Sequence, residues 1–434
     1  MHKRKILNRG WFTIGIGVKR WLLLLLVGLT LSALGLALGL RELYTTVQFP
    51  PSAYYVTLQF WPRPLRMLIL CALGIGATSL AVVRLNRVMI SALLPRNSRR
   101  PNLVQTLWGR SVTRRGPRIV ALGGGHGLST LLSGLKLYTD NITAIVAVAD
   151  DGGSSGRLRQ DFGILPPGDI RRCLAALAEA EPLMTRLFEH RFSTGEGLEG
   201  HTFGNLFITA LAEVTGSFEE AIREANRVLA VRGQIVPATL DDVVLWAELC
   251  GDEDGPGEHI SGESRIAKGG QPIRRVYLQP ADAVASRAAI NAIRDADLVL
   301  LGPGSLYTSL LATMMIGEIT QAIRSSSALR VYICNVATEP GETDHFGVRD
   351  HIQALVDHVG PGVFDLALAN SNDRPTHRFA PEWQGRTSVV PLDAAPDALL
   401  PIRTANVINP DNPLRHDPAK LAREIMRLLE EMGG

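Results

Sequence analysis

Short apolar runs alternate with stretches of helical spacing from residue 118 to the end of the chain. Runs of five to seven mostly apolar residues predict buried strands. They are Arg118–Leu122, Ile142–Val148, Asp297–Leu301, Val331–Val336 and Asp365–Ala369. These runs repeatedly lead into Gly, Asp or Asn and then into a helix, which is typical of a doubly wound parallel sheet. We therefore predict an α/β domain with a doubly wound parallel sheet over residues 118–434.

One region interrupts this alternation. Val243–Leu249 and Ile273–Leu278 read as strands, and the segment between them, Gly251–Gly270, is rich in glycine and charge. We predict a small β insertion over about 233–280. Its tip is either a lid over a site or a plain solvated loop.

Two uncharged apolar runs stand at the front of the chain. Residues 21–40 have the length that crosses a bilayer, and residues 67–83 are at the short limit. A signal peptide is the alternative for the first run and a buried core helix for the second. We predict a membrane hairpin over 1–94, with spans at about 21–40 and 67–83, and a basic juxtamembrane linker over 95–117.

Charge is distributed unevenly and sets the expected orientation of this hairpin. Residues 1–116 contain 17 Lys and Arg but one acidic residue, Glu42, although the whole chain has a net charge of only +3. Basic residues gather before the first span and after the second, which places both termini and the main domain in the cytoplasm. The apolar runs favour a lipid bilayer over nucleic acid as the partner of this basic front. The four cysteines are scattered and suggest no disulfide framework or metal cluster.

The stretch Ala149–Cys173 combines acids, glycines and arginines directly after a predicted strand. It reads ADDGGSSGRLRQDFGILPPGDIRRC. Main-chain N–H groups freed by glycine can surround an anion, and arginine can bind it with two hydrogen bonds. Carboxylates at a strand end can hold Mg²⁺ or ribose hydroxyls. The candidate ligands are Asp151, Gly152, Gly153, Ser154, Arg157, Asp169 and Arg172, with Asp150 and Asp151 as candidate Mg²⁺ ligands.

Two glycine loops each join a predicted strand to a helix, an arrangement that binds phosphate. The first contains Gly124, Gly125, His126 and Gly127, and the second contains Gly302, Gly304, Ser305 and Tyr307. The first loop is not a P-loop, and Leu128 stands where a dinucleotide fingerprint needs its third glycine, which argues against a nicotinamide-dependent dehydrogenase. Tyr307 either stacks on a base or packs in the core. Asn335, near the end of another strand, is a further candidate.

His201 and Asn205 lie in the segment GEGLEGHTFGN, at the entry to a predicted helix. Their polar groups are available for a ligand, and helix capping by Thr202 or Asn205 is the alternative. His201 is the one candidate general base, and with Asp150 it is the candidate for catalysis.

Seven ordered motifs resemble those of the YvcK-like branch of the CofD-like family. They are GGGHGLSTLL, VADDGGSSGRLR, LPPGDIRRCL, HTFGNL, LLGPGSLYTSLL, VATEPGETD and ANSN, between Arg118 and Leu429. The resemblance implies a Rossmann-like fold with a nucleotide site at the strand ends. An N-terminal membrane extension departs from the usual cytoplasmic member.

The resemblance implies two functions. The first is a gluconeogenesis factor that binds a UDP-sugar and affects cell shape and cell-wall synthesis. The second is a Mg²⁺-dependent 2-phospho-L-lactate transferase with a guanosine diphosphate-linked donor. Expected partners are the nucleotide ligand, the bilayer, proteins of cell-wall synthesis and a second copy of the chain.

Overall fold

The computed structural model describes residues 18–46, 55, 60–93, 116–179, 182–250, 257–266, 268–375, 379–393 and 401–432. The chain forms two compact units, Met1–Ser111 and Val112–Gly434. The described helices of the first unit are α1 (Val18–Thr46) and α3 (Arg63–Leu93).

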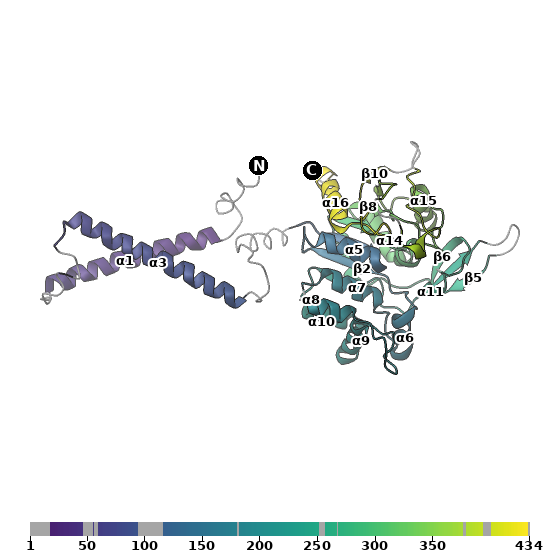
Figure 1. Cartoon of the computed structure of the whole chain (residues 1–434), viewed down its shortest axis with the longest axis horizontal. Coiled ribbons are helices and arrows are strands. Elements are labelled where there is room, and N and C mark those ends of the chain that lie inside the picture. The colour runs from purple at the N-terminus through teal and green to yellow at the C-terminus, as the bar shows by residue number, and fades with distance from the viewer. Residues whose placement is uncertain are drawn as a thin grey trace. The chain divides into compact units, whose positions relative to one another are not determined.

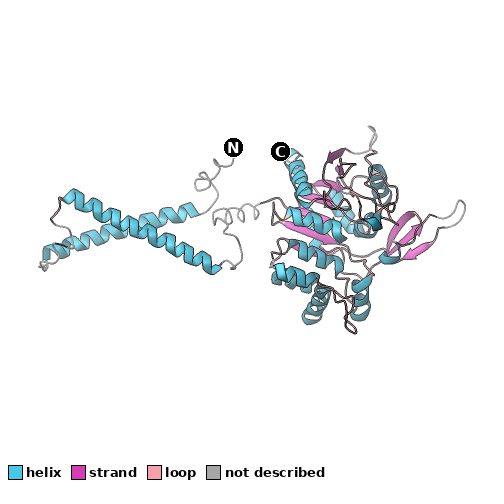
Figure 2. Ribbon diagram, viewed as in Figure 1, coloured by secondary structure: helices cyan, strands magenta, loops and turns pink. Residues whose placement is uncertain are grey.

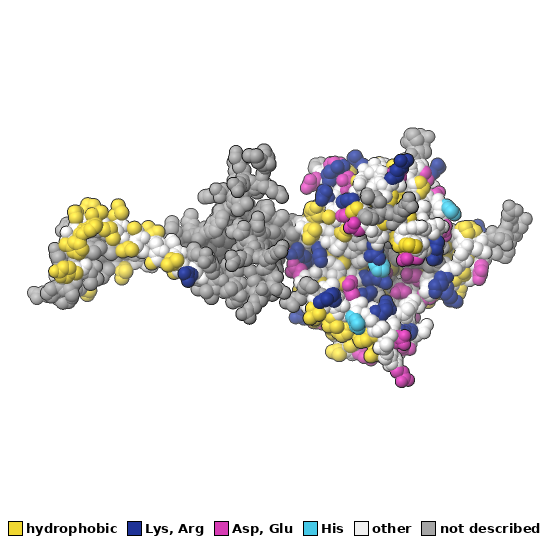
Figure 3. All heavy atoms as spheres, in the orientation of Figure 1, with side chains coloured by type: hydrophobic (Ala, Val, Ile, Leu, Met, Phe, Trp, Pro, Cys, Tyr) yellow, Lys and Arg dark blue, Asp and Glu magenta, His cyan; other side chains and the backbone are white. Residues whose placement is uncertain are grey.

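Large apolar side chains are exposed on both of these helices, among them Leu31 and Leu36 on α1 and Leu68 and Leu73 on α3. Figure 3 shows apolar side chains over much of the described surface of this unit. Over the described residues, no helix combines the length and the apolarity that crossing a membrane requires. The structure therefore gives the predicted membrane hairpin no support. Residues 95–115 of the predicted linker lie outside the described residues.

The second unit is built on a seven-stranded sheet with the strand order β10-β9-β8-β7-β1-β2-β3, every pair of which is parallel. The strands are β1 (Ile119–Gly123), β2 (Ile142–Val146), β3 (Gln234–Pro237), β7 (Leu298–Leu301), β8 (Leu329–Ile333), β9 (Leu366–Asn370) and β10 (Ile402–Ala405). Strands β1, β2, β7 and β9 are buried along their whole length, as expected for a parallel sheet covered on both faces. The predicted α/β, Rossmann-like fold is confirmed for this unit.

Helices connect the strands and flank the sheet (Figures 1 and 2). Helix α5 packs against α7 and α16, and α12 packs against α14. In chain order they are α5 (Gly125–Leu135), α6 (Gly153–Phe162), α7 (Gly168–Leu177), α8 (Pro182–Glu189), α9 (Phe203–Thr215), α10 (Phe218–Val228), α11 (Glu263–Ile266), α12 (Arg287–Asp295), the π-helix η1 (Leu306–Leu311), α13 (Ala312–Met314), α14 (Gly317–Ser325), α15 (Val348–Val359), the 3₁₀-helix η2 (Pro381–Trp383) and α16 (Pro418–Met432).

A small antiparallel sheet stands apart from the large one, with the order β5-β4-β6. Its strands are β4 (Val244–Leu249), β5 (His259–Ser261) and β6 (Ile273–Gln279). The predicted start of the insertion, at about residue 233, was too early. Residues 234–237 form the edge strand β3 of the large sheet and pair with β2. Residues 251–256, in the expected tip, lie outside the described residues.

The connection of the strands reverses direction between β1 and β7. The chain runs outward from β1 through β2 to β3, then returns to the other side of β1 and continues through β7, β8, β9 and β10. Ligands of open α/β sheets bind outside the carboxyl ends of the strands at such a switch point. The loops that follow β1 and β7 therefore flank the expected site.

Candidate functional site

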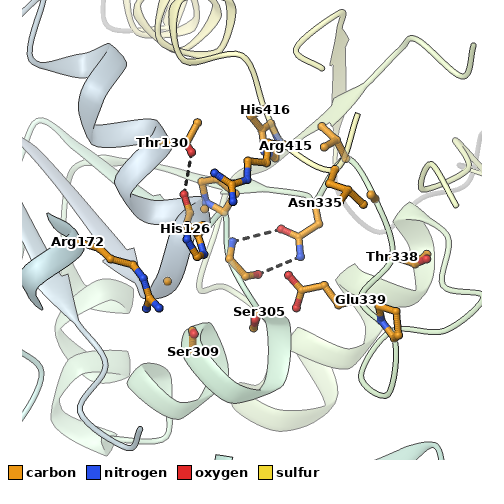
Figure 4. Close-up of a pocket in the computed structure, with 18 of the residues that line it drawn as sticks. His126, Thr130, Arg172, Ser305, Ser309, Asn335, Thr338, Glu339, Arg415 and His416 are labelled. Carbon is orange, nitrogen blue, oxygen red and sulfur yellow. Dashed lines mark hydrogen bonds between the residues drawn. The ribbon is translucent and has the colours of Figure 1, made fainter. Parts of the chain in front are cut away.

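The two predicted glycine loops meet at the switch point. A Cβ atom added to Gly127 would lie 2.6 Å from the carbonyl oxygen of Pro303 and 2.7 Å from the Cα of Gly304. Asn335, in the loop after β8, holds the second loop: its Oδ1 accepts a hydrogen bond from the Gly304 N–H at 3.2 Å, and its Nδ2 donates to the Gly304 carbonyl at 3.0 Å (Figure 4). The loops form one floor, made from segments far apart in the sequence.

A cavity of about 530 Å³ opens over this floor. We call it the switch-point cavity. It is lined by Gly125, His126, Gly127, Thr130, Asp150, Asp169, Arg172, Glu263, Pro303, Gly304, Ser305, Ser309, Asn335, Val336, Ala337, Thr338, Glu339, Pro340, Trp383, Arg386, Leu414, Arg415 and His416. Its size suits a ligand of nucleotide dimensions.

Asp169 fixes the start of α5 against α7. Its Oδ2 accepts a hydrogen bond from the Gly125 N–H at 2.7 Å, and its Oδ1 accepts one from Arg172. Gly124 leaves room for this carboxylate, because a Cβ there would lie 2.2 Å from Asp169 Oδ2. The N–H groups of the first helical turn have no intrahelical acceptor, so the start of α5 can bind an anion.

Cationic and aromatic side chains lie on other walls of the cavity. Arg415 is exposed, and the guanidinium of Arg386 lies 5.9 Å from the ring centre of Trp383. Burial, together with the smaller effect of the charges of Arg172 and Arg415, lowers the pKa of His126 to about 4. His126 is therefore a neutral imidazole at pH 7, while the arginines supply positive charge.

Three carboxyl groups among the lining residues have raised pKa values. Burial is the largest cause for Asp150, Glu263 and Glu339. The negative charge of Asp169 raises the pKa of Asp150 further, and the charges of Asp150 and Asp169 act in the same way on Glu263. Groups of this kind cluster at functional sites, because an ion or a ligand can relieve their repulsion.

The pKa of Glu339 leads to a prediction about stability. Burial and the neighbouring Glu342 raise it to about 8, from 4.5 in an unfolded chain. Between about pH 5 and pH 8 the folded protein therefore binds a proton that the unfolded chain has lost, so the free energy of unfolding should fall as the pH rises. One proton corresponds to a slope of about 1.4 kcal/mol per pH unit. Glu339→Gln should reduce this slope and be more stable than the native chain at pH 8.5.

Urea denaturation at half-unit steps from pH 5 to pH 8.5 measures the slope. Glu382→Gln is the matched control, because Glu382 is exposed and its neutralisation should leave the profile unchanged. Equal slopes in the native chain and in Glu339→Gln would contradict the assignment.

The predicted Mg²⁺ ligands do not form a closed metal site. Asp150 lines the cavity, but Asp151 does not, and its Oδ1 accepts a hydrogen bond from the Ser264 N–H at 2.8 Å. Among the described residues, no three His, Cys, Asp or Glu side chains are placed to hold a metal ion. Mg²⁺ commonly uses one or two carboxylates and completes its shell with substrate phosphates and water. Asp150 fits that role only together with a phosphate-bearing ligand.

Three predicted site residues form a buried cluster that does not line the switch-point cavity. Ser154 Oγ lies 3.0 Å from His201 Nδ1, and Asn205 Nδ2 donates to the same oxygen at 3.0 Å. Thr202 caps α9, with its hydroxyl accepting from the Asn205 N–H at 3.4 Å. Burial and the charge of Arg157 lower the pKa of His201. The cluster joins α6 to α9. Thr202 acts as a helix cap, which is the alternative to ligand binding that the sequence left open.

The remaining candidates also serve local structure. Gly152 and Gly153 stand at the start of α6, and Arg157 donates to the Glu199 carbonyl at 2.7 Å. Gly302 directly follows β7, has φ +80° and does not line the cavity. Tyr307 is buried and makes edge-to-face contacts with Phe346 and His358. Of the two alternatives predicted for Tyr307, stacking on a base or packing in the core, the structure shows packing in the core.

Sequence reasoning missed several lining residues, chiefly Glu263, Glu339, Trp383, Arg386 and Arg415. Glu339 follows a recognised strand, so its position at the carboxyl edge of the sheet was a usable signal. Arg415 lies just before α16, and none of the recognised motifs contains it. Trp383 and Arg386 lie in a segment without regular periodicity, and no local pattern marks them.

The sequence that forms this site matches a protein-family model. The family model for 2-phospho-L-lactate transferase CofD matches residues 119–408. The chain belongs to the CofD family. The match covers the large sheet and its switch-point cavity almost completely, and it confirms the family predicted from the seven motifs.

Relatives within the CofD family differ in how much of the chain they match. The gluconeogenesis factor of Bacillus subtilis strain 168 is 46% identical over 323 residues, which are 73% of this chain and 99% of that protein. A protein of Nostoc sp. strain PCC 7120, provisionally named a gluconeogenesis factor, is 43% identical over 428 residues, or 96% of this chain and 91% of its own length. The chain is thus similar to gluconeogenesis factors, and the Nostoc similarity extends over most of the first unit.

A solved CofD-family relative supports the fold of the second unit. The crystal structure of a UPF0052 family protein from Bacillus halodurans is 41% identical, covers 72% of this chain and 99% of its own, and has a TM-score of 0.66.

Proposed function

We propose that this chain is a regulatory protein of the gluconeogenesis-factor type that binds a UDP-sugar in the switch-point cavity. The observation that carries the proposal is the composition of this one cavity. The start of α5, Arg172 and Arg415 suit a diphosphate, and Trp383 offers an aromatic face for a base. The names of the relatives support the regulatory role. Through this ligand the protein would affect cell shape and cell-wall synthesis.

Thermal-shift binding on the full chain tests the proposal. A ligand that binds only the folded state raises the melting temperature with the logarithm of its excess over Kd. UDP-N-acetylglucosamine and UDP-glucose should each raise it, whereas GDP, GTP and NAD should not, and no product should form on long incubation. A shift produced by guanine nucleotides and not by UDP-sugars would overturn the ligand assignment.

Trp383 gives a residue-level prediction. Loss of a stacked base costs about 1–3 kcal/mol, so Trp383→Ala should weaken UDP-sugar binding by about fivefold to 150-fold, while Trp383→Phe should retain most of the affinity. Calorimetry measures both. Trp246→Ala is the matched control, because Trp246 stacks on Tyr277 in the small sheet and does not line the cavity. Equal losses in the two alanine variants would remove Trp383 from the binding surface.

The alternative function is a Mg²⁺-dependent transferase of the phospholactate type with a guanosine diphosphate-linked donor. The description of the matching family model and the carboxylates at the cavity support it. Bound Mg²⁺ would neutralise phosphate charge, with Asp150 as its protein ligand.

Asp150→Asn separates the two functions. As a binder, the variant should hold a UDP-sugar at least as tightly as the native chain without Mg²⁺, because a negative charge beside the phosphates has been removed. As a transferase, it should lose turnover and any Mg²⁺ dependence. Calorimetry and product analysis with and without Mg²⁺ measure both. Turnover in the native chain that Asp150→Asn abolishes would favour the transferase.

We also propose that the first unit anchors the protein to a membrane, with both termini cytoplasmic. The support is the uncharged run 21–40, the exposed leucines of α1 and α3 and the 17 basic residues of 1–116. Flotation of the full chain with vesicles containing anionic lipid should bring it to the top fraction, and high salt should not release it. Release by salt alone would indicate surface binding without insertion. Self-association and proteins of cell-wall synthesis as partners stay predictions.

A further inference from the structure

Arg171 is a buried cation that forms no hydrogen bond or ion pair through its side chain with any of the residues that the structure describes. Its side chain belongs to α7, and the residue is only 7% exposed. Among the described residues, none accepts a hydrogen bond from its guanidinium or forms an ion pair with it, and its Nε is shielded from solvent. The next residue of α7, Arg172, differs in this respect, because its guanidinium forms an ion pair with Asp169.

The packing around Arg171 holds the guanidinium in place. A Cβ at Gly204 would lie 2.8 Å from both Cγ and Cδ of Arg171, so the start of α9 lies against the aliphatic part of the side chain. Burial lowers its pKa to about 10, which leaves it charged at neutral pH. The charges of Glu189 and Asp169 act on it without forming an ion pair, so the buried guanidinium is only partly compensated, which favours binding of an anion.

Arg171 lines a groove of about 410 Å³ between α5 and α7. We call it the Arg171 groove. Arg172 and Arg415 line both this groove and the switch-point cavity, as do His126 and Thr130, so the two are continuous. Ser129 and Ser133 on α5 add hydroxyl groups that can rotate to donate to an oxyanion.

Positive charge dominates this groove. Three arginines line it, and the one acidic lining residue among those described is Glu189, which is exposed. Arg172 is already paired with Asp169, which leaves Arg171 and Arg415 to compensate an incoming negative charge. Glu189 offsets part of that charge and should limit the affinity for a monovalent anion.

We propose that the Arg171 groove is a second anion subsite, which takes a phosphate or carboxylate group beside the nucleotide cavity. The group belongs either to a free small anion or to an acidic part of the ligand in the switch-point cavity. The inference rests on the switch-point cavity but not on which nucleotide binds there. The burial of Arg171 and the residues that line its groove are the same for any nucleotide.

Ala175 provides the test. It lines the groove one helical turn after Arg171, so Ala175→Glu places a carboxylate where the anion would bind. The variant should melt about 2 °C or more above Ala175→Gln, the uncharged matched control, and should lose the stabilisation that inorganic phosphate gives the native chain. Arg171→Gln should also lower the affinity for phosphate, by about tenfold or more.

The outcomes separate the sources of the anion. Phosphate that stabilises the native chain and Ala175→Gln, but not Ala175→Glu, identifies a site for a free anion. If phosphate alone has no effect but Ala175→Glu weakens UDP-sugar binding at least tenfold relative to Ala175→Gln, the group belongs to the ligand. If Ala175→Glu matches Ala175→Gln in melting temperature and in both binding measurements, the subsite does not exist. The phosphate measurement stands even if UDP-sugars fail to bind.

Discussion

Gly127→Ala should abolish ligand binding, with a loss of affinity of about 100-fold or more. The added methyl group would lie 2.6 Å from the Pro303 carbonyl oxygen and 2.7 Å from two backbone atoms of Gly304. These are main-chain atoms of a loop held by Asn335, so they cannot move aside without displacing the cavity floor. A 100-fold loss of affinity corresponds to about 2.8 kcal/mol, which lies within the usual cost of overpacking.

Stability should fall as well, by about 1–3 kcal/mol, the usual effect of overpacking. Calorimetry and urea denaturation measure the two effects. Gly317→Ala is the matched control: its Cβ would meet no atom within 4 Å, and it lies at the start of α14, outside the cavity-lining residues. Native affinity in Gly127→Ala would show that the two loops do not need close contact for binding.

The sequence was sufficient to predict five of the seven strands of the large sheet, all but the edge strands β3 and β10, and the loops at its centre. Parallel strands buried on both faces appear as continuous apolar runs, so β1, β2, β7 and β9 could be recognised without partners. The apolar runs did not predict the order of the strands in the sheet. Strand β7 pairs with β1 although the two are far apart in the sequence, and no local pattern encodes such a pairing. Edge strand β3 was assigned to the insertion because a run of four residues does not show which sheet it joins.

The site was predicted less completely than the fold, for a physical reason. Gly127 and Asn335 follow strands and could be placed at one edge of the sheet. Glu263 reaches the cavity from the short helix α11 and Trp383 from the 3₁₀-helix η2, and their positions depend on packing that no local pattern encodes.

Conversely, His201 and Tyr307 were predicted to contact a ligand, because polar and aromatic residues in loops often do so. In the folded chain both are buried against α6 or α15. Loop position alone therefore did not distinguish a ligand contact from a packing contact.

Asp169→Asn should destabilise the protein by about 3 kcal/mol, because it removes the charge at the junction of α5 and α7. The native carboxylate is 6% exposed and accepts hydrogen bonds from the Gly125 N–H and from Arg172. An amide of the same size has one oxygen, so it can satisfy only one of these donors well, and it leaves Arg172 without its counter-charge. Breaking a buried pair from one side costs about 3–5 kcal/mol, and the partial exposure of Arg172 reduces this figure.

Two comparisons make the Asp169 prediction specific. Asp242→Asn removes the ion pair with Arg159, but Asp242 has an 81% exposed side chain, so the change should be below about 1 kcal/mol. The pKa of Asp150 should fall in Asp169→Asn, because the charge of Asp169 helps to raise it. Urea denaturation measures the stabilities, and NMR titration of the Asp150 carboxyl measures the pKa. If Asp169→Asn and Asp242→Asn have equal effects and the pKa of Asp150 does not move, Asp169 does not organise the anion-binding end of α5.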